Sequence, residues 1–502
     1  MKLAELPVDA VVPSLLARLR EAPSAVLVAA PGAGKTTRVP PALAMDEGLA
    51  RGQVIVLQPR RAAARAVAAR IAQERGWKPG REVGHHVRFD NQTTRDTKLA
   101  IVTEGILARR LLDDPFLEGV SCVVLDEFHE RSIHCDVAIA LLREVQSTVR
   151  PDLRLLVMSA TLDAAPVAAF LGGAPIIEAP GRLFPVDVLH RARPPTEPLH
   201  EAAARAIRDA GDAPGHVLVF LPGIAEIRRT EALLRPIAGE EIHVLHSSVP
   251  ADAQDRALRP SPARKIILST NIAETSITID GVTTVIDSGL ARVPVMHPGR
   301  GLERLETRRI SIASATQRAG RAGRTAPGRC IRLWAERDNV LMPAQDEPDI
   351  RRLDLAPTVL ALHAWGCADA RSFGWMEKPP ESSLARAEEL LLLLGATDDA
   401  GKLTPRGRRL SAMPLHPRLG AVVLAGTEAG LPRDAALLAA LLSEADIARS
   451  SPRGLAAATD SDGSRSLGGL TRVWPITRPS RTTPSPPSSA SNTVTFSESA
   501  VS

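Results

Sequence analysis

One stretch decides the fold of this 502-residue chain: Ala29-Ala30-Pro31-Gly32-Ala33-Gly34-Lys35-Thr36. It follows the apolar run 25–28 and precedes a segment that can start a helix, so it predicts a strand, a glycine-rich turn and a helix. In such a turn backbone N–H groups surround phosphate oxygens, a lysine reaches the β and γ phosphates, and a hydroxyl holds Mg²⁺. The residues predicted to form this phosphate site are Gly32, Ala33, Gly34, Lys35, Thr36 and Thr37. A loop that only looks like a phosphate site is the alternative, because Ala29 stands where the GxxxxGK[ST] pattern has its first glycine.

Further apolar runs in the first third of the chain end in small or polar residues and alternate with helical patterns. These runs are residues 54–57, 98–102, 122–125 and 155–158. Strands that alternate with helices indicate a doubly wound parallel α/β sheet, which binds ligands at the carboxyl ends of its strands. We therefore expect a first α/β domain at residues 1–180.

A second α/β domain is expected at residues 181–349. Its predicted strands are residues 217–221, 242–245, 266–269 and 285–286. The Pro- and Arg-rich segment 181–214 is expected to be a connection. Because this half has no phosphate loop of its own, we expect the nucleotide to lie between the two domains.

The last third of the chain changes character twice. From about residue 350 the pattern becomes helical, over residues 353–365, 384–394 and 419–442. Residues 450–502 are dominated by Ser, Thr and Pro. Such a segment buries too little apolar surface to offset its ordering entropy, so we predict that it is disordered.

The composition is that of an ordinary soluble protein, with 44% apolar and 24% charged residues. No apolar run approaches the roughly 20 residues that cross a bilayer, so we expect no membrane association and a cytoplasmic location. The four cysteines lack the paired spacing of a zinc site or a disulfide framework. Tyrosine is absent and aromatic residues make up 3%, which argues against an aromatic platform for nucleic acid.

Basic residues are concentrated in one segment. The net charge of the whole chain is +5, yet residues 300–332 hold nine arginines and two glutamates, a net charge of +7. The alternatives are a solvated surface and a binding site for a polyanion. Within the segment, a three-residue spacing would place Arg321 and Arg324 on one face of a helix. Directed across a cleft between domains they would be arginine fingers, which are worth about 10³ to 10⁵ in the rate of phosphoryl transfer.

Two acidic residues, Asp126 and Glu127, stand at the end of the predicted strand 122–125. Cleavage of a phosphoanhydride needs a metal ion to neutralise developing charge and a carboxylate to orient or deprotonate the attacking water. We expect their strand to lie beside the phosphate loop, with Asp126 serving the metal and Glu127 the water. Two acids that meet a strand end by chance are the alternative.

Eight motifs follow one another along the chain: GAGKT, QPRR, TEG, DEFHER, SAT, LVFLPG, STNIAETSITID and QRAGRAGR. In this order they resemble motifs I to VI of superfamily 2 helicases of the DEAH/RHA group. The DEFHER and TEGIL forms and the helical region after residue 350 resemble the bacterial HrpB-type ATP-dependent RNA helicases most. The resemblance covers about residues 5–449 and implies two tandem RecA-like domains, then a winged-helix-like module at 350–413 and the start of a helical ratchet domain at 414–449. The segment around 294–302 resembles the strand-separating hairpin of the group, with an ordinary surface hairpin as the alternative.

The resemblance also implies roles at the nucleotide. Lys35 and Thr36 would hold phosphate and Mg²⁺, with Asp126 and Glu127 as ligands of the metal and the attacking water. The catalytic residues it implies are Glu127, Asp126, His129, Gln317, Arg321 and Arg324. The residues implied to couple the nucleotide to the domain interface are His129, Ser159 and Thr161. The base would lie between Arg70 and Leu258, and because leucine packs without stacking we predict poor discrimination among nucleoside triphosphates.

RNA contacts are implied at strand ends away from the phosphate loop, where hydroxyl, amide and guanidinium groups can follow a phosphate backbone without recognising bases. The residues concerned are Arg60, Arg61, Thr103, Gly105, Gly223 and Thr270. Surface charge is the alternative for the two arginines, and helix capping is the alternative for the two threonines.

The resemblance implies a monomeric ATP-dependent RNA helicase that uses ATP, other NTPs and Mg²⁺. No residue identified in the sequence excludes DNA as a ligand in place of RNA. A nucleotide-gated RNA-binding clamp that hydrolyses NTP without efficient strand separation is the alternative. HrpB-type proteins continue for several hundred residues after this point. The change of composition after residue 449 leads us to expect a truncated or frameshifted reading frame.

Overall fold

The computed structural model describes residues 5–160, 164–179, 181, 184–211, 214–234, 240–274, 279–297 and 302–443. These residues belong to one unit, Met1–Ser443. The tail for which disorder is predicted, residues 450–502, lies outside the described residues.

The first domain is built on a sheet with the strand order β4-β3-β5-β2-β6-β7-β1-β8. Its strands are β1 (Ser24–Ala29), β2 (Gln53–Leu57), β3 (Val83–Val87), β4 (Asp90–Asn91), β5 (Leu99–Val102), β6 (Val120–Leu125), β7 (Arg154–Ser159) and β8 (Ile176–Ala179). All neighbouring strands are parallel except β3 and β4. The predicted doubly wound α/β sheet is confirmed.

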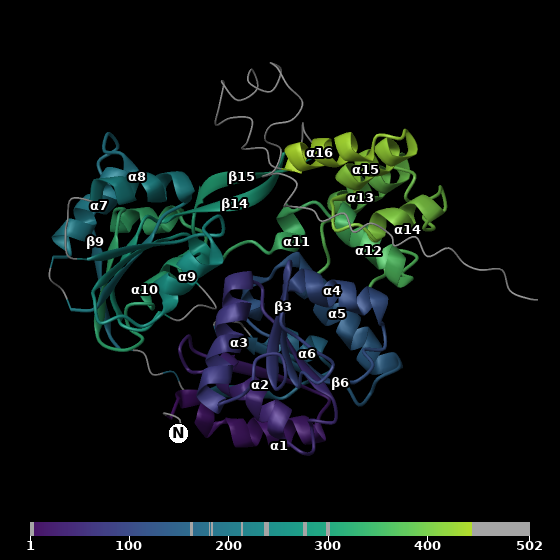
Figure 1. The fold of residues 1–502 in the computed structure, drawn as a ribbon, viewed down its shortest axis with the longest axis horizontal. Helices are drawn as coiled ribbons and strands as arrows, with labels where there is room; N and C mark the ends of the chain where they lie inside the picture. The colour runs from purple at the N-terminus through teal and green to yellow at the C-terminus, as the bar shows by residue number, and fades with distance from the viewer. Residues whose placement is uncertain are drawn as a thin grey trace, which may run out of the picture. The chain divides into compact units, whose positions relative to one another are not determined.

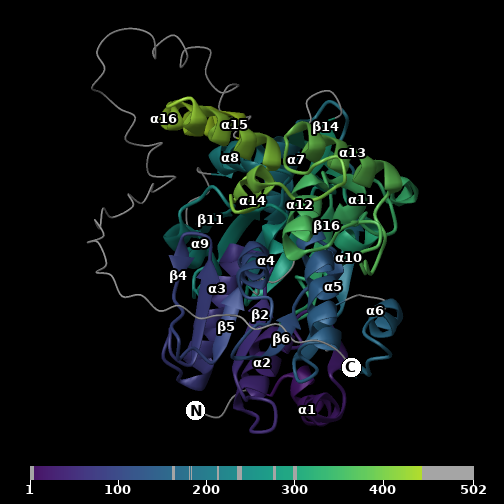
Figure 2. The same cartoon turned by 90° about the vertical axis from the view of Figure 1, so that its right-hand side faces the viewer.

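Helices cover both faces of this sheet (Figure 2). They are η1 (Pro7–Ala10), α1 (Val12–Glu21), α2 (Lys35–Met45), α3 (Arg61–Arg75), α4 (Glu104–Asp113), η2 (Phe128–Glu130), α5 (Ile133–Thr148) and α6 (Ala164–Phe170). Successive side chains of β2 point to opposite faces, so Val54 and Val56 pack with α1–α3 whereas Ile55 and Leu57 pack with α4–α6. Burial on both faces explains why the strands are continuous apolar runs.

The second domain carries a fully parallel sheet with the order β11-β12-β10-β13-β16-β9. Its strands are β9 (Val186–His190), β10 (His216–Phe220), β11 (Glu241–Leu245), β12 (Lys265–Ser269), β13 (Val282–Asp287) and β16 (Gly328–Arg332). Its helices are α7 (Leu199–Asp209), α8 (Ile224–Leu234), α9 (Ala251–Leu258), η3 (Asn271–Ala273), α10 (Ile312–Ala319) and η4 (Glu336–Leu341). One face also buries Ala62 and Ala63 from α3 of the first domain. The two α/β domains therefore share part of a core.

An antiparallel hairpin leaves the second sheet (Figure 1). It pairs β14 (Leu290–His297) with β15 (Leu302–Arg309). The predicted hairpin around residues 294–302 is therefore present, and its role in strand separation stays a prediction.

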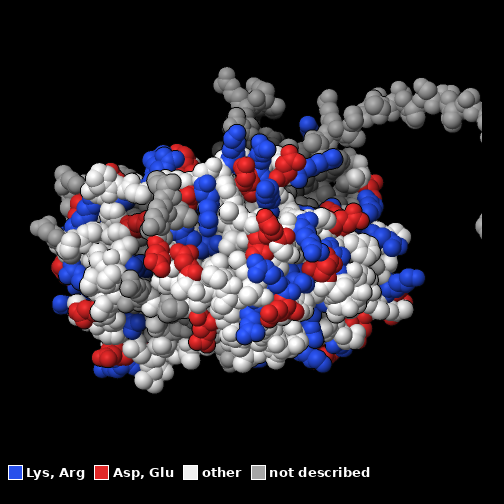
Figure 3. Space-filling model, turned by 90° about the horizontal axis from the view of Figure 1, so that it is seen from below, with Lys and Arg blue, Asp and Glu red and all other residues white. Residues whose placement is uncertain are grey.

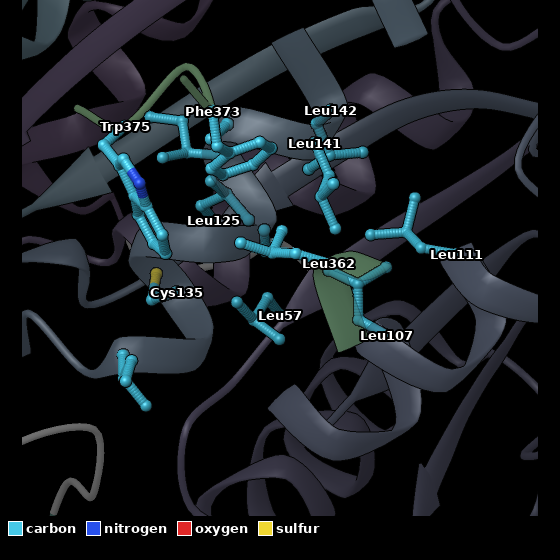
Figure 4. Packing of buried hydrophobic residues seen from close by; sticks show 14 of the residues in the cluster. Leu57, Leu107, Leu111, Leu125, Cys135, Leu141, Leu142, Leu362, Phe373 and Trp375 are labelled. Atoms are coloured by element: carbon cyan, nitrogen blue, oxygen red, sulfur yellow. The ribbon is translucent and has the colours of Figure 1, made fainter. Parts of the chain in front are cut away.

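The remaining named elements are helices. They are α11 (Asp349–Arg352), α12 (Ala356–Trp365), α13 (Glu381–Leu393), α14 (Pro405–Ser411), α15 (Pro417–Glu428) and α16 (Pro432–Ser443). Leu362, Phe373 and Trp375 of this region pack into the same core as Leu107 and Leu125 of the first domain (Figure 4). The helical region is thus anchored on the first domain. None of the described helices is long and apolar enough to span a membrane.

Two expectations were wrong. The segment 181–214 is not merely a connection, because it supplies β9 and α7; β9 completes one edge of the second sheet despite the prolines around it. The segment with Arg321 and Arg324 is not helical, because α10 ends at Ala319.

Candidate nucleotide site

The phosphate loop adopts the strand–turn–helix geometry that its sequence predicts, between β1 and α2. Gly32 and Gly34 have φ angles of 85° and 90°, in the left-handed region that favours glycine. A Cβ atom at Gly34 would also lie 2.5 Å from Cδ1 of Leu6, so Leu6 would have to shift to admit a side chain there. Gly34 is the N-cap of α2, and the first N–H groups of that helix therefore face the loop.

The side chains that follow the loop contact the two acids at the end of β6. Lys35 Nζ lies 3.0 Å from Glu127 Oε1, and both side chains are less than a tenth exposed. The Thr36 hydroxyl donates to Asp126 Oδ2 over 2.6 Å. Thr37 instead donates to the carbonyl of Gly34 over 3.5 Å. Although β7 lies between β1 and β6, the strand ends thus bring the acids to the phosphate loop.

The two acids have opposite electrostatic surroundings. Burial and the neighbouring charge of Glu127 raise the pKa of Asp126 to about 7. Burial alone would raise the pKa of Glu127 as well, but the charge of Lys35, and that of His129 at the acidic pH where its ring is protonated, outweigh burial and lower that pKa to about 2. Glu127 is thus ionised at neutral pH, as a general base must be. Its backbone has φ 54°, an uncommon value for a residue other than glycine.

The donor set fits Mg²⁺. The hydroxyl of Thr36 and the carboxylates of Asp126 and Glu127 are hard oxygen ligands, and Mg²⁺ is usually bound by one or two carboxylates together with substrate phosphates. The pKa of Asp126 is raised although the charge of Lys35 and the hydrogen bond from Thr36 partly offset burial, so a divalent cation would stabilise this carboxylate further. Among the described residues no group of three or more His, Cys, Asp and Glu side chains could hold a metal ion. The metal would therefore depend on the phosphates as well.

His129, which the sequence predicts to couple the nucleotide to the domain interface, lies against Glu127. Its Nδ1 atom is 3.6 Å from Glu127 Oε2 and accepts from the N–H of Ala160 over 3.5 Å. Burial lowers the pKa of His129, so the ring is neutral at pH 7. Ser159 is fully buried at the end of β7. Thr161 lies outside the described residues.

Two arginines of the second domain approach the phosphate loop. A Cβ atom at Gly32 would lie 3.8 Å from both Cγ and Cδ of Arg324. Arg321 is buried and donates through Nε to the carbonyl of Glu274 over 2.8 Å. Burial and the charge of Arg324 lower the pKa of Arg321, and burial lowers that of Arg324 to about 10. A buried cation, Arg321, and a half-buried one, Arg324, thus repel each other, and an anion at the phosphate loop would relieve this repulsion.

A third arginine, Arg318, lies three residues before Arg321 and was not predicted from the sequence to have a role. Arg318 is 1% exposed and lies 2.8 Å from a carboxylate oxygen of Glu274 and 2.9 Å from one of Asp287. Its guanidinium also covers the ring of Phe220. Gln317, the residue before Arg318, is half-buried on α10. Of the acids that hold Arg318, Glu274 stands in the motif STNIAETSITID and Asp287 stands outside all eight motifs, and nothing in their spacing indicates this pairing.

Another missed residue, Gln58, donates through Nε2 to Asp126 Oδ2 and is fully buried. It precedes the predicted RNA contacts Arg60 and Arg61. Arg60 is engaged within the protein, since it lies 3.3 Å from Glu130 and donates to the carbonyl of Asn271 over 2.7 Å. Arg61 is exposed at the start of α3.

The other predicted RNA contacts occupy the ends of elements. Thr103 and Thr270 are the N-caps of α4 and η3, but neither side chain makes a capping hydrogen bond. Gly105 is exposed at the start of α4. A Cβ atom at Gly223 would lie 2.9 Å from the guanidinium carbon of Arg292 in β14. On the face seen in Figure 3 basic and acidic side chains are interspersed, so charge alone does not outline a nucleic-acid path there.

The residues predicted to hold the base lie at the junction of the two domains. Arg70 donates to Glu74 over 2.6 Å, and its Nη1 atom lies 3.9 Å from Asp280 of the second domain. Leu258, at the end of α9, packs against the cluster that contains Ala62 of α3. A base held here would meet one cationic and one aliphatic side chain.

Comparison with known proteins identifies three family models in the chain. The DEAD/DEAH box helicase model matches residues 9–170, and the helicase conserved C-terminal domain matches residues 201–326. The winged-helix helicase associated domain (HA2) matches residues 387–415. The three matches follow the order of the two α/β domains and the helical region.

Similar proteins are helicases and are longer than this chain. The ATP-dependent RNA helicase HrpB of Escherichia coli is 41% identical over 447 residues, which are 88% of this chain and 55% of that protein. The probable ATP-dependent RNA helicase DHR2 of Saccharomyces cerevisiae is 39% identical over 432 residues, 83% of this chain and 59% of DHR2. A crystal structure of the E. coli DEAH/RHA helicase HrpB has a TM-score of 0.82 at 40% identity, covering 91% of this chain and 59% of that one. A crystal structure of the E. coli DExH-box NTPase HrpB has a TM-score of 0.78 at 41% identity, covering 88% and 55%.

Proposed function

Since this chain belongs to the DEAH/RHA group of the DEAD/DEAH box helicases, we propose that it is an ATP-dependent RNA helicase that hydrolyses NTP between its two α/β domains. The observation that carries the proposal is the approach of Arg324, from the second domain, to Gly32 of the phosphate loop. The loop and the acids Asp126 and Glu127 come from the first domain. The hydrolytic site is therefore completed only when the two domains meet.

The ion pair between Lys35 and Glu127 suggests how nucleotide binding prepares the base. A γ-phosphate attracts the Lys35 ammonium more strongly than one carboxylate does, because it carries more negative charge. Once Lys35 turns to the phosphate, the Glu127 carboxylate is available to orient water and accept its proton. Mg²⁺, when bound at Thr36 and Asp126, would neutralise charge on the phosphates. Arg321 and Arg324 would then stabilise the charge that develops on the γ-phosphoryl group.

RNA is proposed as the activating ligand. Thr103, Gly105, Gly223 and Thr270 stand at the ends of elements, and the two threonine side chains are not used for capping. These groups suit a phosphate–sugar backbone better than base edges. Arg60 would have to exchange its contacts with Glu130 and Asn271 for RNA, which would link RNA binding to the junction of the domains.

The proposal is tested by measuring NTP turnover with and without single-stranded RNA, together with displacement of a tailed duplex. RNA should raise turnover, and Glu127→Gln should lower kcat by about 10² to 10⁴ while nucleotide still binds. Glu118→Gln, an exposed carboxylate of the same domain, is the matched control and should behave like the wild type. If RNA stimulates NTP turnover but the duplex is not displaced, the result would favour the alternative function, a nucleotide-gated RNA-binding clamp. Absence of turnover under all conditions would contradict both functions.

A further inference from the structure

The four-residue helix α11 contacts three separate parts of the molecule. The backbone N–H of Asp349 donates to the carbonyl of Arg131, in the loop that follows the catalytic pair, over 3.2 Å. Arg352 donates through Nη1 to the carbonyl of Pro294, in strand β14 of the hairpin, over 2.6 Å. Arg351 donates to Glu377 of the helical region over 2.6 Å. In Figure 1 α11 lies between the hairpin and helix α12.

The loop on which α11 rests is short and conformationally constrained. It runs from Glu127 to Arg131, and these two residues have φ angles of 54° and 48°, both in the left-handed region. Each such backbone costs about 1 kcal/mol or more, so contacts around the loop must hold it in place. Phe128 anchors it in the core of the first domain. Because Arg131 lies only four residues from Glu127 in this constrained loop, a rearrangement at Glu127 would displace Arg131 as well.

The far end of this loop is clamped to α11 and its neighbours. Arg131 binds Asp136 with two hydrogen bonds of 2.9 and 3.1 Å, and it also lies 2.9 Å from Glu377. Glu377 in turn holds Arg351. Charge-assisted and bidentate contacts of this kind fix position as well as adding stability. The loop and α11 are thus joined through one backbone hydrogen bond and one shared carboxylate.

The contact between α11 and the hairpin is made by one oriented side chain, Arg352. Arg352 is held by Asp349 of the same helical turn while it donates to Pro294. Proline has no N–H, so the carbonyl is the single backbone hydrogen-bonding group that this position of β14 offers. Ile350, the middle of α11, is fully buried in the core of the first domain. The helix therefore follows the first domain while its arginine reaches the hairpin that projects from the second.

We propose that α11 transmits the nucleotide state from the catalytic loop to the β14–β15 hairpin, with Arg131, Asp349 and Arg352 as its positioning residues. This inference rests on the proposed function. When the phosphate draws Lys35 away from Glu127, the loop shifts and Arg131 with it. The shift reaches Asp349 through the backbone hydrogen bond, and Arg352 carries it to Pro294. Hydrolysis and movement of the hairpin would be coupled by this short path.

Hydrogen–deuterium exchange tests the inference without requiring hydrolysis. A non-hydrolysable ATP analogue with Mg²⁺ is added to the full chain, and exchange is followed in the phosphate loop and in the hairpin. In the wild-type protein the rate of amide exchange should change in both regions when the analogue binds, by about threefold or more in the hairpin. Arg352→Ala should retain the change at the phosphate loop and lose that in the hairpin, and Arg352→Lys should restore part of it. Arg371→Ala, which breaks ion pairs with Glu381 and Glu388 within the helical region, is the control and should respond like the wild type.

The outcomes separate the two proposals. A hairpin that responds equally in the wild type and in Arg352→Ala overturns the role of α11, and so does a wild-type hairpin that does not respond although the phosphate loop does. In both cases the proposed NTP hydrolysis stands. A wild-type phosphate loop that shows no response to nucleotide overturns the proposed function and the inference together. With RNA present, Arg352→Ala should also displace fewer duplexes per NTP hydrolysed, by about fivefold or more.

Discussion

Three arginines spaced by three residues lie in three different surroundings. Arg318 is enclosed by the carboxylates of Asp287 and Glu274, which makes it part of the structure of the second domain. Arg321 donates to a backbone carbonyl, and Arg324 reaches the phosphate loop of the other domain. The same residue type thus serves packing at Arg318, whereas at Arg321 and Arg324 it is proposed to stabilise the transition state. Exposure and the nearest carboxylate, not residue type, separate these roles.

The pKa of Glu104 predicts a pH dependence of stability. Burial, reinforced by Glu130 and Asp349, raises this pKa from 4.5 to about 7, although Ser132 donates to the carboxyl group. The folded state therefore holds the proton between these pH values while the unfolded state releases it. The stabilisation is complete below pH 4.5 and is lost as the pH rises through about 7, by about 1–3 kcal/mol.

The measurement is the Tm of the wild type and of Glu104→Gln, which resembles the protonated acid. Between about pH 5.5 and about pH 8 the wild type should lose about 2–4 °C more than the variant. Parallel Tm profiles would show that Glu104 keeps an ordinary pKa in the folded protein.

At the scale of elements, close approach limits substitution in the helical region. A Cβ atom at Gly407 of α14 would overlap the carbonyl oxygen of Ala396 and lie 2.7 Å from Leu403 Cδ1. Gly407→Ala should therefore destabilise this region by about 1–3 kcal/mol, because a packed interior cannot move aside for one methyl group. Gly374→Ala in the same region has open space around it and should leave Tm unchanged. Thermal unfolding compares the two variants, and equal Tm values would contradict the packing described for α14.

The elements also show how far sequence patterns carry. The phosphate loop and most central strands are predicted well, because a strand buried on both faces is a continuous apolar run and a phosphate loop has few solutions. The strands β9 and β16 were missed because they carry polar residues, and pairing with neighbours distant in sequence decides their conformation. Helix α10 ends before Arg321 because the following glycines favour a turn. Side chains that meet across elements, such as Gln58 with Asp126, leave no local pattern.

At the scale of the molecule, the base site proposed at the junction of the two domains predicts the nucleotide selectivity. There Arg70 and Leu258 would offer the base a cation and an aliphatic surface, and neither would recognise the hydrogen-bonding edge of one particular base. Sites without such hydrogen bonds discriminate weakly. The values of kcat/KM for ATP, GTP and CTP should therefore agree within about tenfold. Strict dependence on ATP would show that other groups recognise the base.

The junction also holds the proposed hydrolytic site, which is split between the two domains. The most direct measurement is kcat for ATP hydrolysis at saturating RNA by the wild type and by Arg324→Ala, together with nucleotide affinity. The split site predicts that Arg324→Ala lowers kcat by about 10³ or more while the Kd for nucleotide changes little. A variant that hydrolyses ATP within a few-fold of the wild-type rate would contradict it.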